Sequence, residues 1–264
     1  MKRLKHETAL VTGGNRGIGE GIVLRLAEAG ADVAINYKSE ALQEEAERVK
    51  RKVLERGQRA FTVQADVSVK NDVDRMIEAV EKNLGPISIL VNNAGIAPFV
   101  PFMQLTEELW EQTYNTNVKS IFLTSQAVAK GMIGREHGKI INITSTASIM
   151  VTSPVVPHYI SSKAAAYQLT RALAIELGKY NINVNAVGPS TVNTELTKEY
   201  LADPDIYRQE VEANPMKRLG TPQQIGDAVV FLASREAMQI NGHLLMVDGG
   251  LTVKAAQPED HLQR

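Results

Sequence analysis

The chain has 264 residues, enough for one large domain or two small ones, and its 44% hydrophobic and 22% charged residues are ordinary for a globular protein. Its 29 basic and 30 acidic side chains give a formal net charge of −1, which excludes the strong positive field that attracts nucleic acid or anionic lipid. The absence of cysteine excludes disulfides, thiolate nucleophiles, zinc–thiolate sites and iron–sulfur clusters.

The N-terminal segment is basic over residues 1–5 and apolar over residues 8–12. This apolar run is too short for the core of a signal peptide. No uncharged apolar stretch of about 18 residues, the length that spans a bilayer, follows in the sequence. We therefore predict a cytoplasmic protein with no membrane contact, and we interpret residues 8–12 as its first strand.

Strands and helices alternate along the rest of the chain. After the first strand, Ile18, Ile22 and Leu26 are spaced at fours, which predicts a helix that ends at Gly30. Residues 87–91 are mostly apolar on both faces, as in a sheet that helices cover on both sides. Similar patterns predict strands at 32–36, 60–64, 87–91, 139–144, 183–187 and 243–247, and helices at 40–56, 69–84, 105–131, 159–177 and 222–233.

This alternation is typical of βαβ units and a parallel sheet. Because no Pro-, Ser- or Gly-rich linker interrupts it, the sequence predicts a single doubly wound α/β domain over residues 1–264, with helices on both faces of a seven-stranded parallel sheet. Residues 190–215 break the rhythm, with Pro204 and Pro215 among helical fragments. Their position predicts a lid over the carboxyl ends of the last strands.

A glycine-rich loop, with Gly13, Gly17 and Gly19, lies between the first predicted strand and the first predicted helix. Glycines there let the backbone approach a ligand, and the helix N-terminus offers free N–H groups to a pyrophosphate. The spacing differs from G-x-G-x-x-G, and glycines of a tight turn would look the same, but the position favours a nucleotide site. No Lys-Ser or Lys-Thr pair follows, which argues against a P-loop ATPase.

Four further segments fall at the predicted carboxyl ends of later strands: Asp66 with Val67, residues 92–95, Ser145, and residues 188–191. Polar residues and glycines also terminate strands for no functional reason. Because ligands of open α/β sheets bind at this edge, the four segments together predict one binding site.

Tyr159 and Lys163 are four residues apart in a predicted helix, so their side chains share one face. An ammonium about 4 Å from the phenol contributes about 4 kcal/mol at an effective dielectric of about 20, and one pKa unit corresponds to about 1.4 kcal/mol. Such a pair, less the cost of desolvation, moves the phenol pKa towards neutral and suits proton transfer beside a hydride transfer. Taken alone, the spacing also fits an exposed pair on a helix.

Over residues 4–250 the chain resembles the short-chain dehydrogenase/reductase family. The resemblance implies a nicotinamide-dependent oxidoreductase that acts on CH–OH groups, with a seven-stranded Rossmann sheet and usually a homotetramer. The matching segments stand in the family's order: residues 12–19 (TGGNRGIG), Asp66, residues 92–95 (NNAG), Asn117, Ser145, residues 159–163 (YISSK), residues 188–189 and residues 248–250 (DGG).

The resemblance also implies roles for individual residues. Tyr159 corresponds to the general acid and base, and Lys163 to the group that lowers its pKa and binds the nicotinamide ribose. Ser145 corresponds to the group that hydrogen-bonds the substrate oxygen, and Asn117 to the support of a water in the proton relay. The implied cofactor contacts are Gly13, Asn15, Arg16, Gly17, Ile18, Gly19, Lys38, Asp66 (adenine edge), Val67, Asn93 (ribose), Ala94, Gly95, Tyr159, Lys163, Pro189, Val192 and Thr194 (the last two at the carboxamide).

Two positions depart from the family's pattern. The serine often lies thirteen residues before the tyrosine, where this chain has Thr146, but the preceding Asn-x-Thr context favours Ser145 at fourteen. The family's Pro-Gly after the sixth strand is Pro189-Ser190 here. That turn lacks a residue that adopts the left-handed conformation freely.

The cofactor is predicted from the end of the second strand, where NAD-selective proteins place an acid on the ribose 2′-hydroxyl. Residues 36–39 (NYKS) contain no carboxylate, and Lys38 and Arg16 suit a 2′-phosphate, although both also fit plain solvated side chains. We predict NADP as the cofactor, with NAD possible, and no metal.

The substrate is predicted only as a class. The motifs resemble those of the glucose 1-dehydrogenase-like branch, which favours a sugar or polyol dehydrogenase; the alternative is a 3-oxoacyl-carrier-protein or small-ketone reductase. A non-catalytic NADP(H)-sensing protein is a remote alternative, because such proteins usually lose the tyrosine or lysine that this chain keeps. Trp110, in the long fourth helical region, is interpreted as a core or subunit-interface residue.

Overall fold

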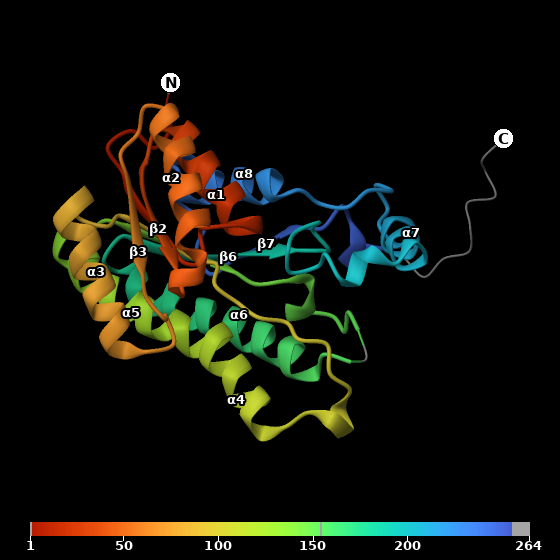
Figure 1. The fold of residues 1–264 in the computed structure, drawn as a ribbon. Coiled ribbons are helices and arrows are strands. Elements are labelled where there is room, and N and C mark those ends of the chain that lie inside the picture. Colours follow the sequence, from red (N-terminus) through yellow and green to blue (C-terminus); the bar gives the residue numbers. More distant parts are fainter. Residues whose placement is uncertain (1, 154, 255–264) are drawn as a thin grey trace.

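The computed structural model describes residues 2–153 and 155–254, and its centre is a parallel sheet of seven strands (Figure 1). The strand order is β3-β2-β1-β4-β5-β6-β7, and every neighbouring pair is parallel. The chain leaves β1 in one direction to build β2 and β3, then returns to the other side for β4 to β7. This confirms the predicted doubly wound α/β fold, and it places the switch point of the sheet between β1 and β4.

The predicted elements agree with the structure to within a few residues. The strands are β1 (Thr8–Val11), β2 (Asp32–Tyr37), β3 (Ala60–Gln64), β4 (Ile89–Asn92), β5 (Gly138–Ile143), β6 (Ile182–Pro189) and β7 (Leu244–Val247). The helices are α1 (Gly17–Ala29), α2 (Gln43–Glu55), α3 (Lys70–Leu84), α4 (Glu107–Tyr114), α5 (Ser120–Arg135), α6 (Pro157–Gly178), α7 (Pro204–Ala213) and α8 (Pro222–Ala233).

One predicted helix is divided in the structure. The expected helix at 105–131 consists of α4, a π-helical turn at Asn115–Lys119, and α5, which continues to Arg135. No glycine or proline marks this division in the sequence. Such single π turns recur at functional sites, because the extra residue changes the direction in which nearby side chains point.

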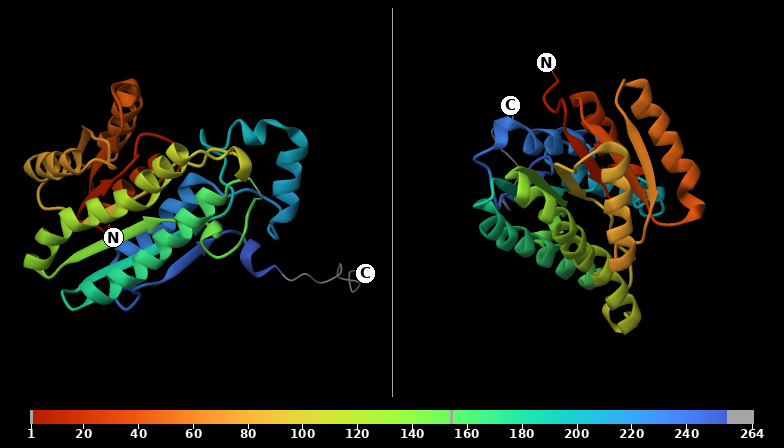
Figure 2. Two further views of the ribbon diagram at one scale, coloured as in Figure 1. Left: turned by 90° about the horizontal axis from the view of Figure 1, so that it is seen from below. Right: turned by 90° about the vertical axis from the view of Figure 1, so that its left-hand side faces the viewer.

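Helices cover both faces of the sheet (Figure 2). A hydrophobic layer joins the helices to each face. Neighbouring residues of β4 face opposite layers: Val91 packs with α1, α2 and α8, whereas Leu90 packs with α3, α5 and α6. The alternation follows from the two-residue period of a strand. It explains why the strands are apolar on both faces, as the sequence predicted.

Helix α2 belongs to the charged stretch that the sequence analysis interpreted as solvated. The helix is amphipathic: Ala46, Val49 and Val53 are fully buried against the sheet, while most of its charged side chains face outward. Its spacing of three and four residues between buried positions is that of one helical face. Because the inner face of α2 packs against the sheet, it also fixes where the charged side chains of this helix lie.

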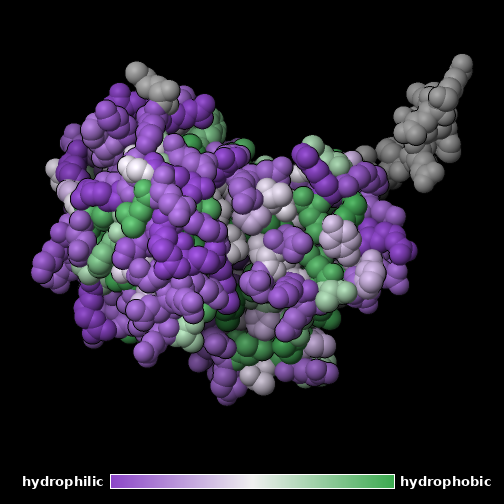
Figure 3. Space-filling view, turned by 45° about the horizontal axis from the view of Figure 1, so that its top comes forward, coloured by the Kyte–Doolittle hydropathy of each residue, from purple (hydrophilic) through white to green (hydrophobic). Residues whose placement is uncertain are grey.

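Beyond the carboxyl ends of the strands, residues 190–215 form a separate feature that includes the short helix α7 (Figures 1 and 2). Figure 3 shows a mostly hydrophilic surface on the side of the N terminus, with hydrophobic residues gathered in and around the hollow beside α7. Among the described residues, no helix combines the length and the apolar character that crossing a bilayer requires.

Candidate active site

The glycine-rich loop has the backbone that its sequence suggested. Gly13 and Gly17 have φ values of +59° and +55°, a left-handed conformation that residues with a β-carbon rarely adopt. A β-carbon on Gly19 would lie 2.1 Å from the carbonyl oxygen of Gly13. Arg16 precedes α1, and its side chain makes no capping hydrogen bond. The first N–H groups of α1 therefore have no capping side chain as acceptor and are suited to bind a phosphate.

Two asparagines, the buried Asn36 and the partly buried Asn93, hold this loop in place. Asn36, on β2, accepts a hydrogen bond from the N–H of Gly13 at 3.2 Å and donates one to Ala65 at 3.0 Å. Asn93, after β4, donates from its side-chain nitrogen to the carbonyl oxygens of Thr12 and Gly13 at 2.9 and 3.0 Å. The sequence analysis expected Asn93 at the ribose. The structure adds that it ties β4 to the phosphate loop, and that Asn36 does the same from β2.

The tyrosine and lysine lie on α6, which begins at Pro157. The ammonium nitrogen of Lys163 is 5.6 Å from the centre of the Tyr159 ring, and it donates a hydrogen bond to the carbonyl oxygen of Ile143 at 3.0 Å. Lys163 is 6% exposed. Its burial disfavours the charged form and lowers the pKa of its ammonium to about 8.

The pKa of Tyr159 is governed mainly by desolvation in this structure. Burial raises the pKa of the phenol, and the neighbouring Ser145 hydroxyl acts in the opposite direction. In the protein without its cofactor, Lys163 therefore does not produce the expected lowering of the Tyr159 pKa. It stays a prediction for the complex, in which the charges around the phenol differ.

Ser145 and Thr146 differ in their surroundings. Ser145 follows β5, is partly exposed beside Tyr159, and accepts a hydrogen bond from the N–H of Ala147 at 3.1 Å. Thr146 is 3% exposed and belongs to the interior. This arrangement favours Ser145 as the group that contacts a substrate oxygen.

Asn117 lies in the π-helical turn and is 1% exposed. Its amide donates to the carbonyl oxygen of Ile96 and to the hydroxyl of Ser162, both at 3.0 Å, and accepts from the N–H of Ile96 at 2.9 Å. A β-carbon on Gly95 would lie 3.3 Å from the Asn117 oxygen and 3.5 Å from the Lys163 nitrogen. Asn117 and Lys163 therefore meet at Gly95, from two different helical segments.

The remaining predicted cofactor residues lie along the same edge. Lys38 pairs with Asp66 at 3.0 Å. Burial alone would raise the pKa of Asp66, but hydrogen bonds from Ser68 and the ammonium of Lys38 outweigh it and lower that pKa. Asp66 thus stays ionised beside the carboxyl end of β3.

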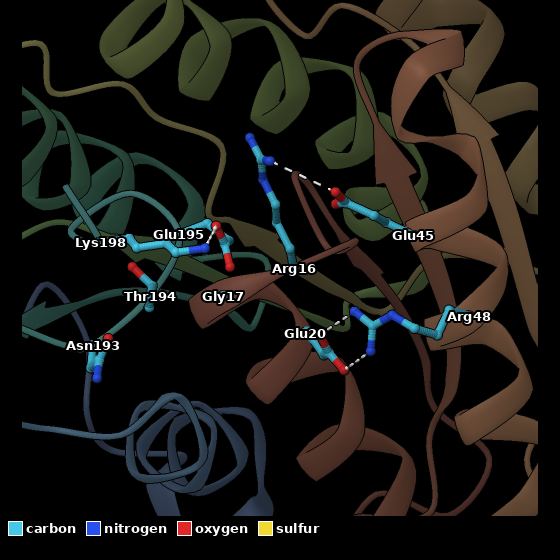
Figure 4. A pocket seen from close by; sticks show the side chains of 9 residues that line it. All are labelled: Arg16, Gly17, Glu20, Glu45, Arg48, Asn193, Thr194, Glu195 and Lys198. Atoms are coloured by element: carbon cyan, nitrogen blue, oxygen red, sulfur yellow. Dashed lines mark hydrogen bonds and ion pairs between the residues drawn. The ribbon is translucent and has the colours of Figure 1, made fainter. Parts of the chain in front are cut away.

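A pocket of about 530 Å³ opens between the phosphate loop and residues 193–198 (Figure 4). Thr194 reaches the loop closely, because a β-carbon on Gly17 would lie 3.3 Å from the Thr194 β-carbon. Val192, also predicted, is buried and bridges to Gly220. The lining side chains come from both walls: Arg16, Glu20, Glu45 and Arg48 on one, and Asn193, Thr194, Glu195 and Lys198 on the other.

The turn after β6 tolerates its serine. Ser190, which replaces the family's glycine, keeps a φ outside the left-handed region. The turn after Pro189 therefore does not use the left-handed conformation that glycine adopts freely, as expected for a serine at this position. Pro189 is the last residue of β6 and is buried, and its contact with the cofactor stays a prediction.

Three residues near the site carry no motif and were not predicted. The ring of Phe99 stacks on that of Tyr200, with centroids 5.1 Å apart. The carboxylate of Glu210, on α7, accepts hydrogen bonds from the hydroxyls of Tyr200 and Thr191 at 2.7 and 2.6 Å. Residues 190–215 are thus joined internally by Glu210 and to the loop after β4 by the aromatic stack.

Comparisons with known proteins agree with this geometry. A family model described as Enoyl-(Acyl carrier protein) reductase matches residues 13–252. The chain is 38% identical to 5-keto-D-gluconate 5-reductase of Escherichia coli (strain K12) over 250 residues, which cover 95% of this chain and 97% of that protein. It is 38% identical to a 3-oxoacyl-(acyl-carrier-protein) reductase of Staphylococcus epidermidis, with 93% and 99% covered.

A solved structure has a similar fold. A gluconate 5-dehydrogenase from Burkholderia cenocepacia J2315, in complex with NADP and tartrate, superimposes with a TM-score of 0.90 at 35% sequence identity. The match covers 96% of this chain and 98% of that one. The likeness therefore extends over nearly the whole chain.

Proposed function

The chain belongs to the short-chain dehydrogenase/reductase family, and from this membership and the geometry of the site we propose that it is a sugar or polyol dehydrogenase that uses NADP, with NAD possible. It is an NAD(P)-dependent oxidoreductase that transfers a hydride between nicotinamide and a secondary alcohol or its carbonyl. The observation that carries the proposal is the pair of Tyr159 with the buried Lys163, at the carboxyl edge of the sheet that also carries the glycine loop.

The residues fit a dinucleotide. The loop at Gly13 and Gly17 brings backbone N–H groups to the surface with no β-carbon in the way. Arg16, directly before α1, and Lys38, directly after β2, provide cations. When bound, the nicotinamide accepts or supplies the hydride. The other steps of the reaction fall to the side chains of this protein.

In the direction of oxidation, the substrate hydroxyl gives its proton to the Tyr159 oxygen while the carbon loses its hydride. Ser145 orients the substrate oxygen with a hydrogen bond. Lys163 favours the ionised phenol and binds ribose hydroxyls, while Asn117 supports the water through which the proton leaves. Reduction reverses each transfer, with the phenol as the donor.

The substrate class is supported by two of the proteins compared above, whose names specify gluconate or its 5-keto form. The equally similar 3-oxoacyl-(acyl-carrier-protein) reductase supports the second candidate, reduction of a 3-oxoacyl thioester or small ketone. The test is to supply NADPH with 5-keto-gluconate, a 3-oxoacyl thioester and simple ketones in parallel. A dominant rate with the thioester would favour the second candidate.

We also propose that residues 1–264 act as one catalytic domain in which residues 190–215 are the substrate lid. The Phe99–Tyr200 stack supports a closed position of this segment, because it joins the segment to the loop after β4, and the Glu210 hydrogen bonds hold the segment together internally. A cytoplasmic location suits the proposed chemistry, because cells regenerate NADP internally.

The protein is further proposed to be a homotetramer. Exposed apolar side chains on α4, α5 and α6 support a subunit interface on that side: Trp110 is 39% exposed, Phe122 46% and Ile175 86%. Trp110 also stacks on Tyr114 at 4.9 Å, which gives α4 an outward aromatic face. Association would remove these surfaces from water.

A further inference from the structure

The two cations that suit a 2′-phosphate are both paired with carboxylates. Lys38 lies 3.0 Å from Asp66, and Arg16 lies 3.8 Å from Glu45 (Figure 4). In the folded protein each of these two cations has a carboxylate partner, so neither offers a phosphate an unopposed positive charge.

The two carboxylates are held in place by different partners. Asp66 is held by the backbone and the hydroxyl of Ser68 at 3.0 and 2.6 Å, and it is expected at the adenine. Glu45 reaches from α2 to the phosphate loop, where it accepts a hydrogen bond from the Asn15 side chain at 2.8 Å. Asn15 is 3% exposed, so Glu45 is anchored to a buried partner.

This anchoring places a negative charge next to Arg16. A 2′-phosphate carries nearly two negative charges, so it competes with Glu45 for Arg16 and is repelled by it. The 2′-hydroxyl of NAD carries no charge and meets neither effect. The carboxylate therefore acts against one of the two cofactors only.

We propose that Glu45 is a specificity-determining residue that weakens the binding of NADP relative to NAD and brings the two affinities closer together. The proposal rests on the proposed use of both nucleotides at this site. It concerns their relative binding and does not depend on which alcohol the enzyme oxidises.

Glu45→Gln isolates the charge. The glutamine oxygen keeps an acceptor for the Asn15 amide, so the contact between α2 and the loop is preserved while the negative charge is lost. The matched control is Glu44→Gln, one residue earlier. Glu44 is exposed and does not line the pocket, but its replacement changes the net charge by the same amount.

The experiment is calorimetric titration of the full-length wild type and both variants with NADP and, separately, with NAD at low salt. We expect Glu45→Gln to lower the dissociation constant for NADP about fivefold and to leave that for NAD within about twofold. Glu44→Gln should move neither constant by more than about twofold. Added salt should reduce the gain, because it screens the interaction between Glu45 and the phosphate.

An equal change for both nucleotides in Glu45→Gln would overturn the inference and assign Glu45 a purely structural role through Asn15. Weaker NADP binding would overturn it as well. Because binding is measured without substrate, a selective gain for NADP upholds the inference even if no sugar is oxidised. An active sugar dehydrogenase without that gain would uphold the proposed function and refute the inference.

Discussion

The ammonium nitrogen of Lys163 lies 5.6 Å from the centre of the Tyr159 ring and is hydrogen-bonded at 3.0 Å to the carbonyl oxygen that ends β5, that of Ile143. The sheet thus fixes the position of the cation, and α6 presents the phenol beside it. Desolvation raises the pKa of the Tyr159 phenol and lowers the pKa of the Lys163 ammonium. Its consequences for catalysis and for stability are separable by substitution.

Removal of the phenol hydroxyl tests its role in proton transfer. Tyr159→Phe keeps the ring next to Lys163 but deletes the proton donor and acceptor, so we expect kcat to fall by about 10²–10⁴-fold. Cofactor affinity should stay within about threefold of the wild type, since the ring and the phosphate loop are unchanged. Steady-state kinetics with a nucleotide titration check this, and retained turnover would contradict the assignment.

Lys163→Met tests the desolvation of the ammonium through stability. Burial lowers the pKa of Lys163 to about 8, below the ordinary value of 10.5, so between these values the unfolded chain binds more protons than the folded one. The wild type should therefore lose stability as the pH falls from about 10.5 to 8, and the penalty should be complete below 8. The methionine variant lacks that penalty.

The measurement is the free energy of unfolding by urea for both proteins at several pH values. The difference between variant and wild type should move in favour of the variant by up to about 3 kcal/mol as the pH falls from 10.5 to 8. Other titrating groups are shared and cancel. A difference that does not depend on pH would show that Lys163 is not desolvated in the folded protein.

Ser145→Ala and Thr146→Ala separate the two candidates for contact with the substrate oxygen. Ser145 is partly exposed next to Tyr159, so we expect its loss to reduce kcat/KM by about a hundredfold, with little change in stability. Thr146 is buried, so its loss should lower the unfolding temperature and leave kcat/KM within a few fold. The reverse pattern would assign the role to Thr146.

The proposed lid is tested at Tyr200, whose hydroxyl donates to Glu210. Burial and the Glu210 carboxylate raise the pKa of Tyr200 to about 12, so the hydroxyl stays protonated at neutral pH. Tyr200→Phe keeps the stack on Phe99 but removes a hydrogen bond to a charged acceptor, which should raise KM for the substrate about tenfold. The exposed Tyr207 provides the control, and Tyr207→Phe should leave KM unchanged.

The assembly is tested by mass and by one charged substitution. Gel filtration should give about four times the chain mass of 28.9 kDa. Phe122→Lys places a charge on the proposed α5 interface and should lower that mass, whereas Leu54→Lys, at a similarly exposed apolar residue on α2, should not. A wild-type mass near that of one chain would contradict the tetramer.

Much of the fold was predictable because it depends on local periodicity. The edge strand Ala60–Gln64 and the helix Pro222–Ala233 match their predicted ranges. The π-helical turn at Asn117 was not predictable. Its side chain bonds to Ile96 and Ser162, so the deviation is stabilised by contacts 21 and 45 residues away.

The site was predictable where motifs mark it, at the glycine loop and at Tyr159 and Lys163. It was not predictable where function depends on pairing between distant elements. Glu45 belonged to a charged stretch that seemed merely solvated, and only the packing of α2 brings it to Asn15 and Arg16. No sequence motif marks Glu210 either, because its partners are the hydroxyls of Thr191 and Tyr200, which come together only when residues 190–215 fold.

The most direct measurement is the initial rate of NADP reduction with a panel of sugars, polyols and gluconate, run side by side on the wild type and Tyr159→Phe. The proposed function predicts rapid, saturable reduction with at least one sugar or polyol, together with a loss of about 10²–10⁴-fold in the variant. No reduction with any member of the panel, together with rapid oxidation of NADPH by a 3-oxoacyl thioester, would contradict it.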